Sequence, residues 1–434
     1  MMVLLRRARF LVFAFALLMV GACSTAEPAH ARPIPPADTT AQQQSTDVTP
    51  YESNRGIAYH VLATPAYLLH GATRPLGWTV KYLERNFPQL FKPEPQRRGV
   101  LPLVELGGPS GVAGGLALYD NNLFGTNQKA RLEGLIGARD FFEVELRYER
   151  PRLFGPRTSF LVEANYFSEP EDRFYLGGIR AERSEDRALF SRHQFDVMTR
   201  VQYRPKGRFS GALDVLYERV DASPEEGDEG APLVGLPGLQ PTNLLTPRAE
   251  FVLDWTQGTQ RVYAGTRVLL RLDYTHDLNG DRFRYGRYTA AVQQFVPVLF
   301  FPQTRRLALR ARLEQVEPLF GGEAVPFYHL PRLGGQQTLR GFISDRFRDT
   351  GSLLFSAEYR YPVWNRMDAV FFVDTGQVFG AFDEVSARDF RTTFGGGFHL
   401  LGGNGLSARF EVARSVEGVE VILTVKPAFG RAPR

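Results

Sequence analysis

Apolar and charged residues alternate with a period of two along most of this chain, and this pattern constrains its fold more than any other feature. The clearest examples are Phe142 to Tyr148, Leu307 to Leu313, Leu406 to Val412 and Val419 to Val425. Period two is typical of β-strands, whose successive side chains point to opposite faces. A closed protein core would not hold so many arginines and glutamates. We therefore predict strands with one face toward lipid and the other toward a water-filled lumen.

About 16 such segments can be counted between residues 99 and 429, which predicts an all-β fold, a transmembrane antiparallel β-barrel. Helical membrane spans are not expected, because no long uncharged apolar stretch follows the N-terminal region. The predicted connections alternate in length. The short ones, expected in the periplasm, include Asn121 to Gly125, Pro205 to Gly207 and Pro362 to Asn365. The long ones, expected to face outward, are Ser168 to Asp186, Asp221 to Thr246, Glu317 to Thr350 and Gly376 to Asp389.

Residues 1–23 have the pattern of a secretory signal peptide. Three arginines precede the apolar run Phe10 to Val20, which is too short to span a bilayer comfortably. Cys23, the only cysteine of the chain, follows small residues as in a bacterial lipoprotein signal and is a candidate site of lipid attachment. The alternative is ordinary cleavage nearby, which would remove this cysteine or leave it in the chain without a lipid. No internal disulfide can form in either case.

The regions that flank the predicted barrel differ from it in composition and in hydrophobic periodicity. Residues 24–56 are rich in Pro, Ala, Thr and Gln, which predicts a disordered linker. In residues 57–98, apolar side chains recur at mostly helical spacing, which predicts a short periplasmic amphipathic helical segment. This segment would lie on the membrane face or pack on the barrel's periplasmic turns, and both alternatives stay open. The barrel would end at Phe429, followed by a tail of residues 430–434.

Three separate segments place one arginine and two acids where they could meet. Arg340, Gly341 and Phe342 lie in a glycine-hinged loop between the eleventh and twelfth predicted strands, and Glu358 and Asp374 lie on the polar side of the twelfth and thirteenth. Both carboxylates can therefore point into one enclosed space, where the arginine could pair with them. By itself Arg-Gly-Phe is only what a surface turn offers. The ordered set of three segments is the informative signal.

This ordered set resembles the barrels of the BamA/TamA-like superfamily, the bacterial surface antigen barrels, over roughly residues 100–429. In that family, an Arg-Gly-Phe loop tip folds back into the lumen and pairs with acids on the twelfth and thirteenth strands. The resemblance also implies a weakly paired seam between the first and last strands, and a terminal aromatic, here Phe429, that acts as a signal for insertion. The residues that it assigns to a lumen latch are Arg340, Gly341, Phe342, Glu358 and Asp374.

The same resemblance implies a function at the outer membrane of a Gram-negative bacterium. The expected role is outer-membrane biogenesis, or transport and translocation of protein or lipid. Outer-membrane lipids and an unfolded outer-membrane protein or lipid client are the expected partners, and the sequence names no partner protein. The family's periplasmic POTRA repeats are not expected, since residues 24–99 would barely hold one and show no strand pattern. The chain is therefore similar to a POTRA-less branch of the superfamily.

The alternatives are a passive porin-like pore and an outer-membrane hydrolase. No nucleophile stands beside a base: Gly107 to Gly111 contains a serine but lacks the nucleophile-elbow spacing. His193 and His399 each lack a second histidine at metal-ligand spacing, and the acidic run Glu225 to Glu229 lacks the pattern of a calcium loop. We therefore expect no enzyme activity, no catalytic residue, no metal and no cofactor. A net charge of +5 over 434 residues gives no reason to expect nucleic acid.

Overall fold

The computed structural model describes residues 98–424, except 109–110, 182–186, 206, 225–232, 234, 259–260, 263, 281, 299–304, 323, 365 and 403–404. The predicted signal peptide, linker and C-terminal tail lie outside the described residues, as do Cys23 and Phe429. So does the predicted helical segment, apart from Arg98, which already belongs to the first strand.

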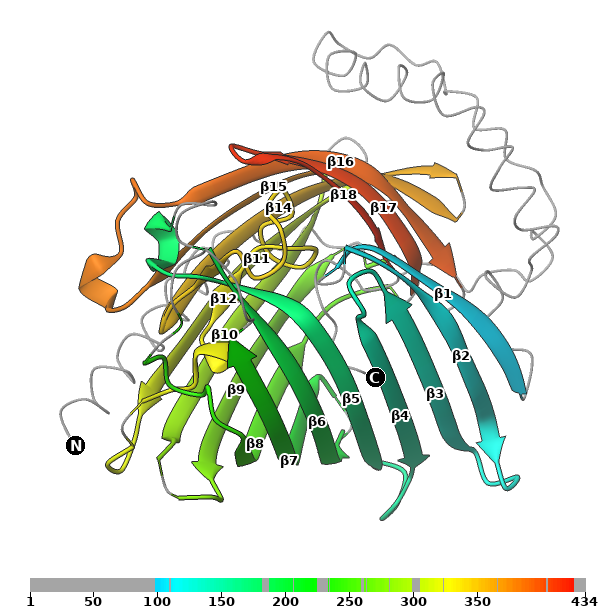
Figure 1. Cartoon of the computed structure of the whole chain (residues 1–434). Helices are drawn as coiled ribbons and strands as arrows, with labels where there is room; N and C mark the ends of the chain where they lie inside the picture. Colours follow the sequence, from blue (N-terminus) through cyan, green and yellow to red (C-terminus); the bar gives the residue numbers. More distant parts are fainter. Residues whose placement is uncertain are drawn as a thin grey trace, which may run out of the picture. The chain divides into compact units, whose positions relative to one another are not determined.

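Sixteen antiparallel strands close into a barrel within the described residues (Figure 1). The first eight are β1 (Arg98–Gly108), β2 (Gly111–Leu123), β3 (Gln128–Gly137), β4 (Phe142–Pro151), β5 (Thr158–Tyr175), β6 (Arg187–Tyr203), β7 (Phe209–Pro224) and β8 (Thr242–Asp254). The other eight are β9 (Gly265–Asp277), β10 (Arg284–Pro297), β11 (Arg306–Pro318), β14 (Gly351–Trp364), β15 (Met367–Phe379), β16 (Arg391–Gly402), β17 (Gly405–Ser415) and β18 (Gly418–Thr424). The predicted barrel of about 16 strands is confirmed.

The remaining elements are short and lie in the connections. Two of them, β12 (Arg332–Leu333) and β13 (Phe347–Arg348), form a small separate ribbon between β11 and β14. Among the described residues, the 3₁₀ helices are η2 (Gly178–Arg180), η3 (Phe327–His329) and η4 (Phe382–Glu384). Within the described ranges, no helix is both long and apolar enough to cross a bilayer.

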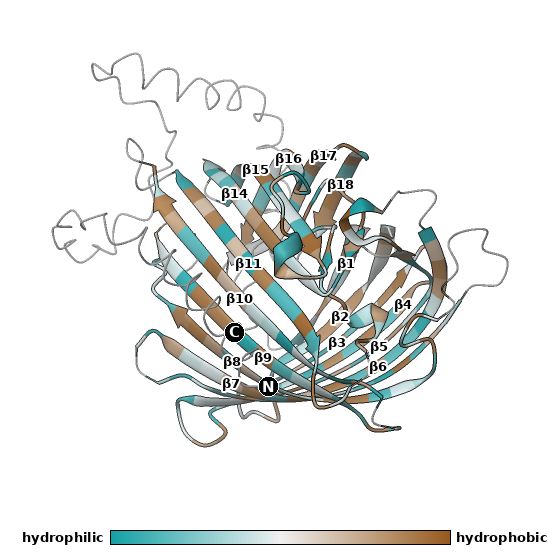
Figure 2. Ribbon diagram, turned by 90° about the vertical axis from the view of Figure 1, so that its left-hand side faces the viewer, coloured by the Kyte–Doolittle hydropathy of each residue, from teal (hydrophilic) through white to brown (hydrophobic). Residues whose placement is uncertain are grey.

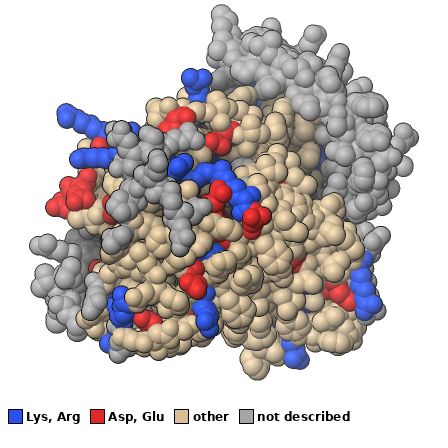
Figure 3. Space-filling view, in the orientation of Figure 1, with Lys and Arg blue, Asp and Glu red and all other residues tan. Residues whose placement is uncertain are grey.

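The two faces of the barrel wall differ as the alternation predicted. On β2, for example, Val112, Leu116 and Leu118 are exposed on the outer face, whereas the intervening Ala113 and Ala117 are buried. Bands of apolar and polar residues alternate along the strands (Figure 2). In the space-filling view, charged side chains are sparse over wide stretches of the strand surface (Figure 3). An apolar outer face of this kind suits contact with lipid. Closure of the barrel also pairs the backbone groups of every strand, which the bilayer core contains no water to satisfy.

Two of the connections expected to face outward are much shorter than the sequence predicts, because the strands beside them are longer. β5 continues to Tyr175 and β7 to Pro224, so both project past the predicted loop starts. On these extensions, Phe174 and Ala222 face inward and are buried in a cluster with Phe327 of η3. The Phe174 and Phe327 rings meet edge to face, with centroids 5.2 Å apart. Packing against a distant connection thus keeps these segments extended, which local turn chemistry does not reveal.

The connection from β11 to β14, residues 319–350, folds into the barrel. On one side, η3 belongs to an apolar cluster with side chains of β5, β6, β7, β8, β10 and β11. On the other side, the connection packs against β14, β15 and η2 through a second apolar cluster. The lumen near this connection is therefore occupied by protein. The connection lies between the eleventh and twelfth barrel strands, β11 and β14, as the count of strands in the sequence predicted.

Candidate functional site

The turn that carries Arg340 is closed by its own hydrogen bonds. Gly334 and Gly335 have φ angles of 118° and 87°, a region that glycine enters without steric cost. The Gly335 amide donates to the Phe342 carbonyl at 3.0 Å. The Thr338 hydroxyl accepts from the Gly334 amide at 2.9 Å and donates to the Gly334 carbonyl at 2.8 Å. These bonds make the turn a compact unit that can carry a side chain to a defined place.

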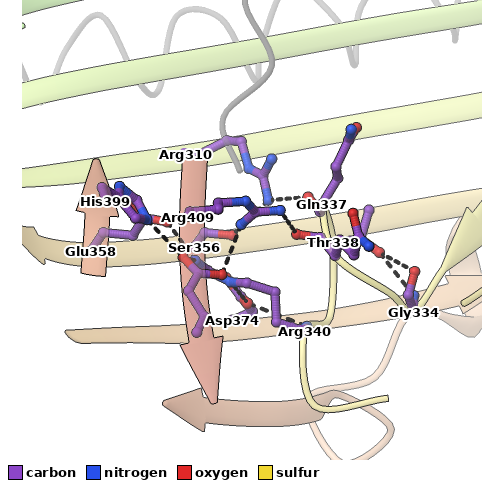
Figure 4. Close-up of polar contacts among 12 residues, drawn as sticks. Arg310, Gly334, Gln337, Thr338, Arg340, Ser356, Glu358, Asp374, His399 and Arg409 are labelled. Atoms are coloured by element: carbon purple, nitrogen blue, oxygen red, sulfur yellow. Dashed lines mark hydrogen bonds and ion pairs between the residues drawn. The ribbon is translucent and has the colours of Figure 1, made fainter. Parts of the chain in front are cut away.

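Arg340 lies at the centre of a cluster of carboxylates (Figure 4). Its Nε donates to Asp374 Oδ2 at 2.7 Å, and its Nη2 donates to Asp374 Oδ1 at 2.9 Å. Its Nη1 donates to Glu358 Oε1 at 2.7 Å and to Glu411 Oε1 at 3.2 Å. The guanidinium carbon lies over the Phe372 ring, 3.4 Å from its centroid. A planar fork on an aromatic face uses what distinguishes arginine from lysine.

The cluster around Arg340 is shielded from solvent. The Arg340 side chain is 1% exposed, and the side chains of Glu358, Asp374 and Glu411 are 0% exposed. Burial alone would lower the pKa of Arg340, but the carboxylates of Asp374, Glu358 and Glu411 hold that pKa above its ordinary value. The alternating pattern predicts a water-filled lumen, but the lumen is dry at this cluster. Removing one charge from a dry cluster costs more than the same change in water.

Strand register brings the three acids around the arginine. Glu358, Asp374 and Glu411 lie on the inward sides of β14, β15 and β17, respectively. Between them, Gly395 of β16 pairs in register with Phe372 of β15. A Cβ at Gly395 would lie 2.6 Å from the Phe372 ring. The glycine thus leaves room for the ring that supports the guanidinium.

Further polar residues surround the cluster, and the sequence analysis did not assign them to a site. Arg360 donates twice to Glu358 Oε2, at 2.8 and 2.6 Å. Glu411 accepts from Arg409 Nη1 at 2.8 Å and lies 2.8 Å from His399 Nε2. In the sequence, His399 has no second histidine at metal-ligand spacing, and Arg409 and Glu411 are polar residues of the alternating segment Leu406 to Val412. Their inward parity is visible in the sequence, but their nearness to β14 depends on the closed sheet.

Phe342 attaches the same turn through apolar burial. Its ring meets that of Phe347 edge to face, with centroids 5.0 Å apart, and it is 2% exposed. Both rings belong to an apolar cluster that joins the connection to η2, β14 and β15. Its members are Ile179, Leu333, Leu339, Phe342, Phe347, Leu354 and Val378. The structure therefore holds the Arg-Gly-Phe tip by ion pairs on one side and by packing on the other.

Arg346 is a second buried arginine of the connection, which the sequence analysis missed. Its Nη2 donates to the Ala181 carbonyl at 2.7 Å and lies 2.8 Å from Glu417 Oε1. Its guanidinium carbon also lies 4.3 Å from the centroid of the Tyr175 ring. Arg346 thus ties the connection to the segment after η2 and to the turn between β17 and β18.

Gly341 lies directly against the backbone of β17. A Cβ built there would be 2.7 Å from the Arg414 carbonyl carbon and 2.9 Å from the Ser415 nitrogen. Because these are backbone atoms, they cannot rotate away. We expect Gly341→Ala to displace the tip and to lower the free energy of unfolding by about 1–3 kcal/mol. Denaturant unfolding and limited proteolysis of residues 319–350 would measure this.

Gly280→Ala is the matched control for that substitution. Gly280 also lies in a connection, and a Cβ there would meet no atom within 4 Å. A Gly341→Ala protein as stable and as resistant to proteolysis as Gly280→Ala would contradict the close approach.

Within the part of the chain that the structure describes, no three His, Cys, Asp or Glu side chains are grouped so that they could hold a metal ion. The arrangement around Arg340 joins loop to wall by charge neutralisation and packing. The interactions of these side chains attach the connection to the barrel wall.

Comparison with known proteins identifies the barrel. Residues 122–417 match the Omp85 superfamily domain. The chain belongs to the Omp85 superfamily. As expected from the sequence, this Omp85 barrel is a protein of the Gram-negative outer membrane. Proteins of the superfamily are non-enzymatic transporters and assembly factors.

Several solved structures share the fold of this Omp85 chain. BamA from Haemophilus ducreyi lacking POTRA domains 1-3 has a TM-score of 0.56 and 16% identity, with 76% of this chain and 70% of that chain covered. CdiB from Acinetobacter baumannii has a TM-score of 0.50 and 12% identity, covering 76% and 59%. CdiB from Escherichia coli has a TM-score of 0.53 and 13% identity, covering 76% and 62%. None of the curated proteins compared matches the chain significantly.

Proposed function

We propose that this Omp85 barrel acts in outer-membrane biogenesis or in translocation, with an unfolded outer-membrane protein or a lipid as its client. Membership of the superfamily supports the general role. The observation that carries the proposal is the buried cluster of Arg340 with Glu358, Asp374 and Glu411, which ties a long connection to three strands of the wall. In this proposal, Arg340, Gly341, Phe342, Glu358 and Asp374 work as a lumen latch.

The packing of the connection favours this role over a passive pore. A porin needs a steady water path, whereas residues 319–350 pack against both sides of the lumen through two apolar clusters. A plugged barrel must change before anything large passes. We therefore propose that the function depends on changes in the barrel wall and in the connection of residues 319–350. We do not propose an enzyme activity.

Deletion of the gene in its native bacterium tests the proposed function. We expect the outer membrane to lose particular proteins or lipids, with recovery when the wild-type protein is restored from a plasmid. Quantitative analysis of purified outer membranes measures both classes of molecule. The same purified protein would be placed in planar bilayers. An unchanged outer membrane, together with steady solute-selective conductance of the wild-type barrel, would overturn the proposal in favour of the pore.

A further inference from the structure

The turn between β8 and β9, residues 255–264, folds into the lumen. Val262 of this turn packs against Phe295 of β10 and Ala308 of β11, two buried residues that pair in register. The turn thus extends past its own two strands and covers the inner surface of the next two. It lies at the end of the barrel that is predicted to face the periplasm, because it contacts the end of β14, where the predicted periplasmic turn Pro362 to Asn365 lies.

Arg261 attaches this turn to a distant part of the wall. Its Nε donates to Asp368 Oδ1 of β15 at 2.9 Å, and its Nη2 donates to the Trp364 carbonyl of β14 at 2.8 Å. Asp368 is 1% exposed and also accepts from Arg306 of β11. Between β9 and β15 the wall contains β10, β11 and β14. Since neighbouring strands lie about 4.8 Å apart, the turn and its arginine together span roughly 19 Å of the wall.

The strands that hold Arg261 are also strands that hold the latch. Asp368 and Asp374 lie on the same strand, β15, at an even spacing, so both side chains point to the inward face. β14 likewise contacts both Arg261 and Arg340. The two arginines come from different segments of the chain, one from the turn between β8 and β9 and the other from the connection between β11 and β14. The same part of the wall is therefore the attachment site for two separate segments that enter the lumen.

We propose that the turn between β8 and β9 is a second latch, which narrows the periplasmic end of the lumen independently of the connection. Arg261 holds this turn against the wall, and Val262 covers the wall beneath it. A path through the lumen then needs two separate releases, one at Arg340 and one at Arg261. The inference concerns access to the lumen, and it applies equally to a protein, a lipid or a small solute. It does not depend on the proposed function.

Cysteine labelling of the full-length protein in lipid nanodiscs tests the second latch. Ala308, which packs against Val262, is 0% exposed, so Ala308→Cys places a thiol that a maleimide reaches only when the turn opens. We expect Arg261→Ala to speed labelling of this thiol about tenfold, the factor for losing a charged hydrogen bond that keeps a buried site closed. The label is measured on the peptide that contains residue 308, which separates it from Cys23.

Arg157→Ala is the matched control, because Arg157 lies in the turn between β4 and β5, at the same end of the barrel, and is exposed. Faster labelling in Arg261→Ala alone supports the second latch, and equal labelling in both variants would overturn it. A thiol at Ala117 of β2, which is also 0% exposed, detects general loosening of the barrel. If Arg261→Ala speeds labelling of Ala117→Cys as much as labelling of Ala308→Cys, the turn is not a local closure and the proposal fails.

Conductance in planar bilayers tests whether the two latches act in series. When two constrictions follow one another, opening one of them leaves the other as the limit to ion flow. Arg261→Ala and Arg340→Ala should therefore each raise the conductance only slightly, and the double variant should raise it by more than the sum of the two single effects. A double variant that shows no more than this sum would contradict two independent closures.

Discussion

Replacing Arg340 by alanine should lower the free energy of unfolding by about 3–5 kcal/mol, the range for breaking a buried ion pair by removing one partner. The reason is that three carboxylates, on Glu358, Asp374 and Glu411, would stay buried without the cation they share. A wet lumen would screen the loss, but the side chains of this cluster are at most 1% exposed. Thermal unfolding in detergent and proteolysis of residues 319–350 would measure the effect.

Two further variants sharpen this experiment. Arg340→Lys should recover only part of the stability, because an ammonium cannot bind Asp374 with two nitrogens and stack on Phe372 as the guanidinium does. Arg332→Ala is the control from the same connection. Its ion pair with Asp345 is half exposed on the arginine side, so its loss should cost less than about 1 kcal/mol. Equal behaviour of Arg340→Ala and Arg332→Ala would rule out a latch in the lumen.

Phe342→Ala should destabilise the loop by a similar amount, about 3–5 kcal/mol, through lost apolar burial and the cavity left behind. The ring is 2% exposed and packs on Phe347 within the cluster that joins the connection to η2, β14 and β15. The ion pairs of Arg340 keep their partners in this variant. The same unfolding and proteolysis measurements apply.

Phe320→Ala controls for loss of a ring in the same connection, because Phe320 is 66% exposed. We expect this control to unfold almost as the wild type does. If Phe342→Ala also unfolds like the wild type, the apolar cluster does not hold the tip, and the arginine would have to do so alone. Comparing Phe342→Ala with Arg340→Ala therefore separates packing from charge.

The sequence by itself determined the class of fold and the place of the critical loop. Period-two alternation reports directly on strands with two unlike faces, since each side chain's face follows from its position. Counting those strands put Arg340 between the eleventh and twelfth, and parity put Glu358 and Asp374 on inward faces. These inferences succeed because they need only local geometry.

Only the tertiary structure decided which distant residues share a site. For Glu411 the sequence shows the inward parity but not the partners, because these are fixed by ring closure, by register along four strands and by the path of a long connection. The lengths of β5 and β7 depend likewise on packing against Phe327. Whether the lumen is wet or dry at Arg340 follows from what fills it. Contacts between segments far apart in the chain set all of these features, and alternation along a single strand does not encode them.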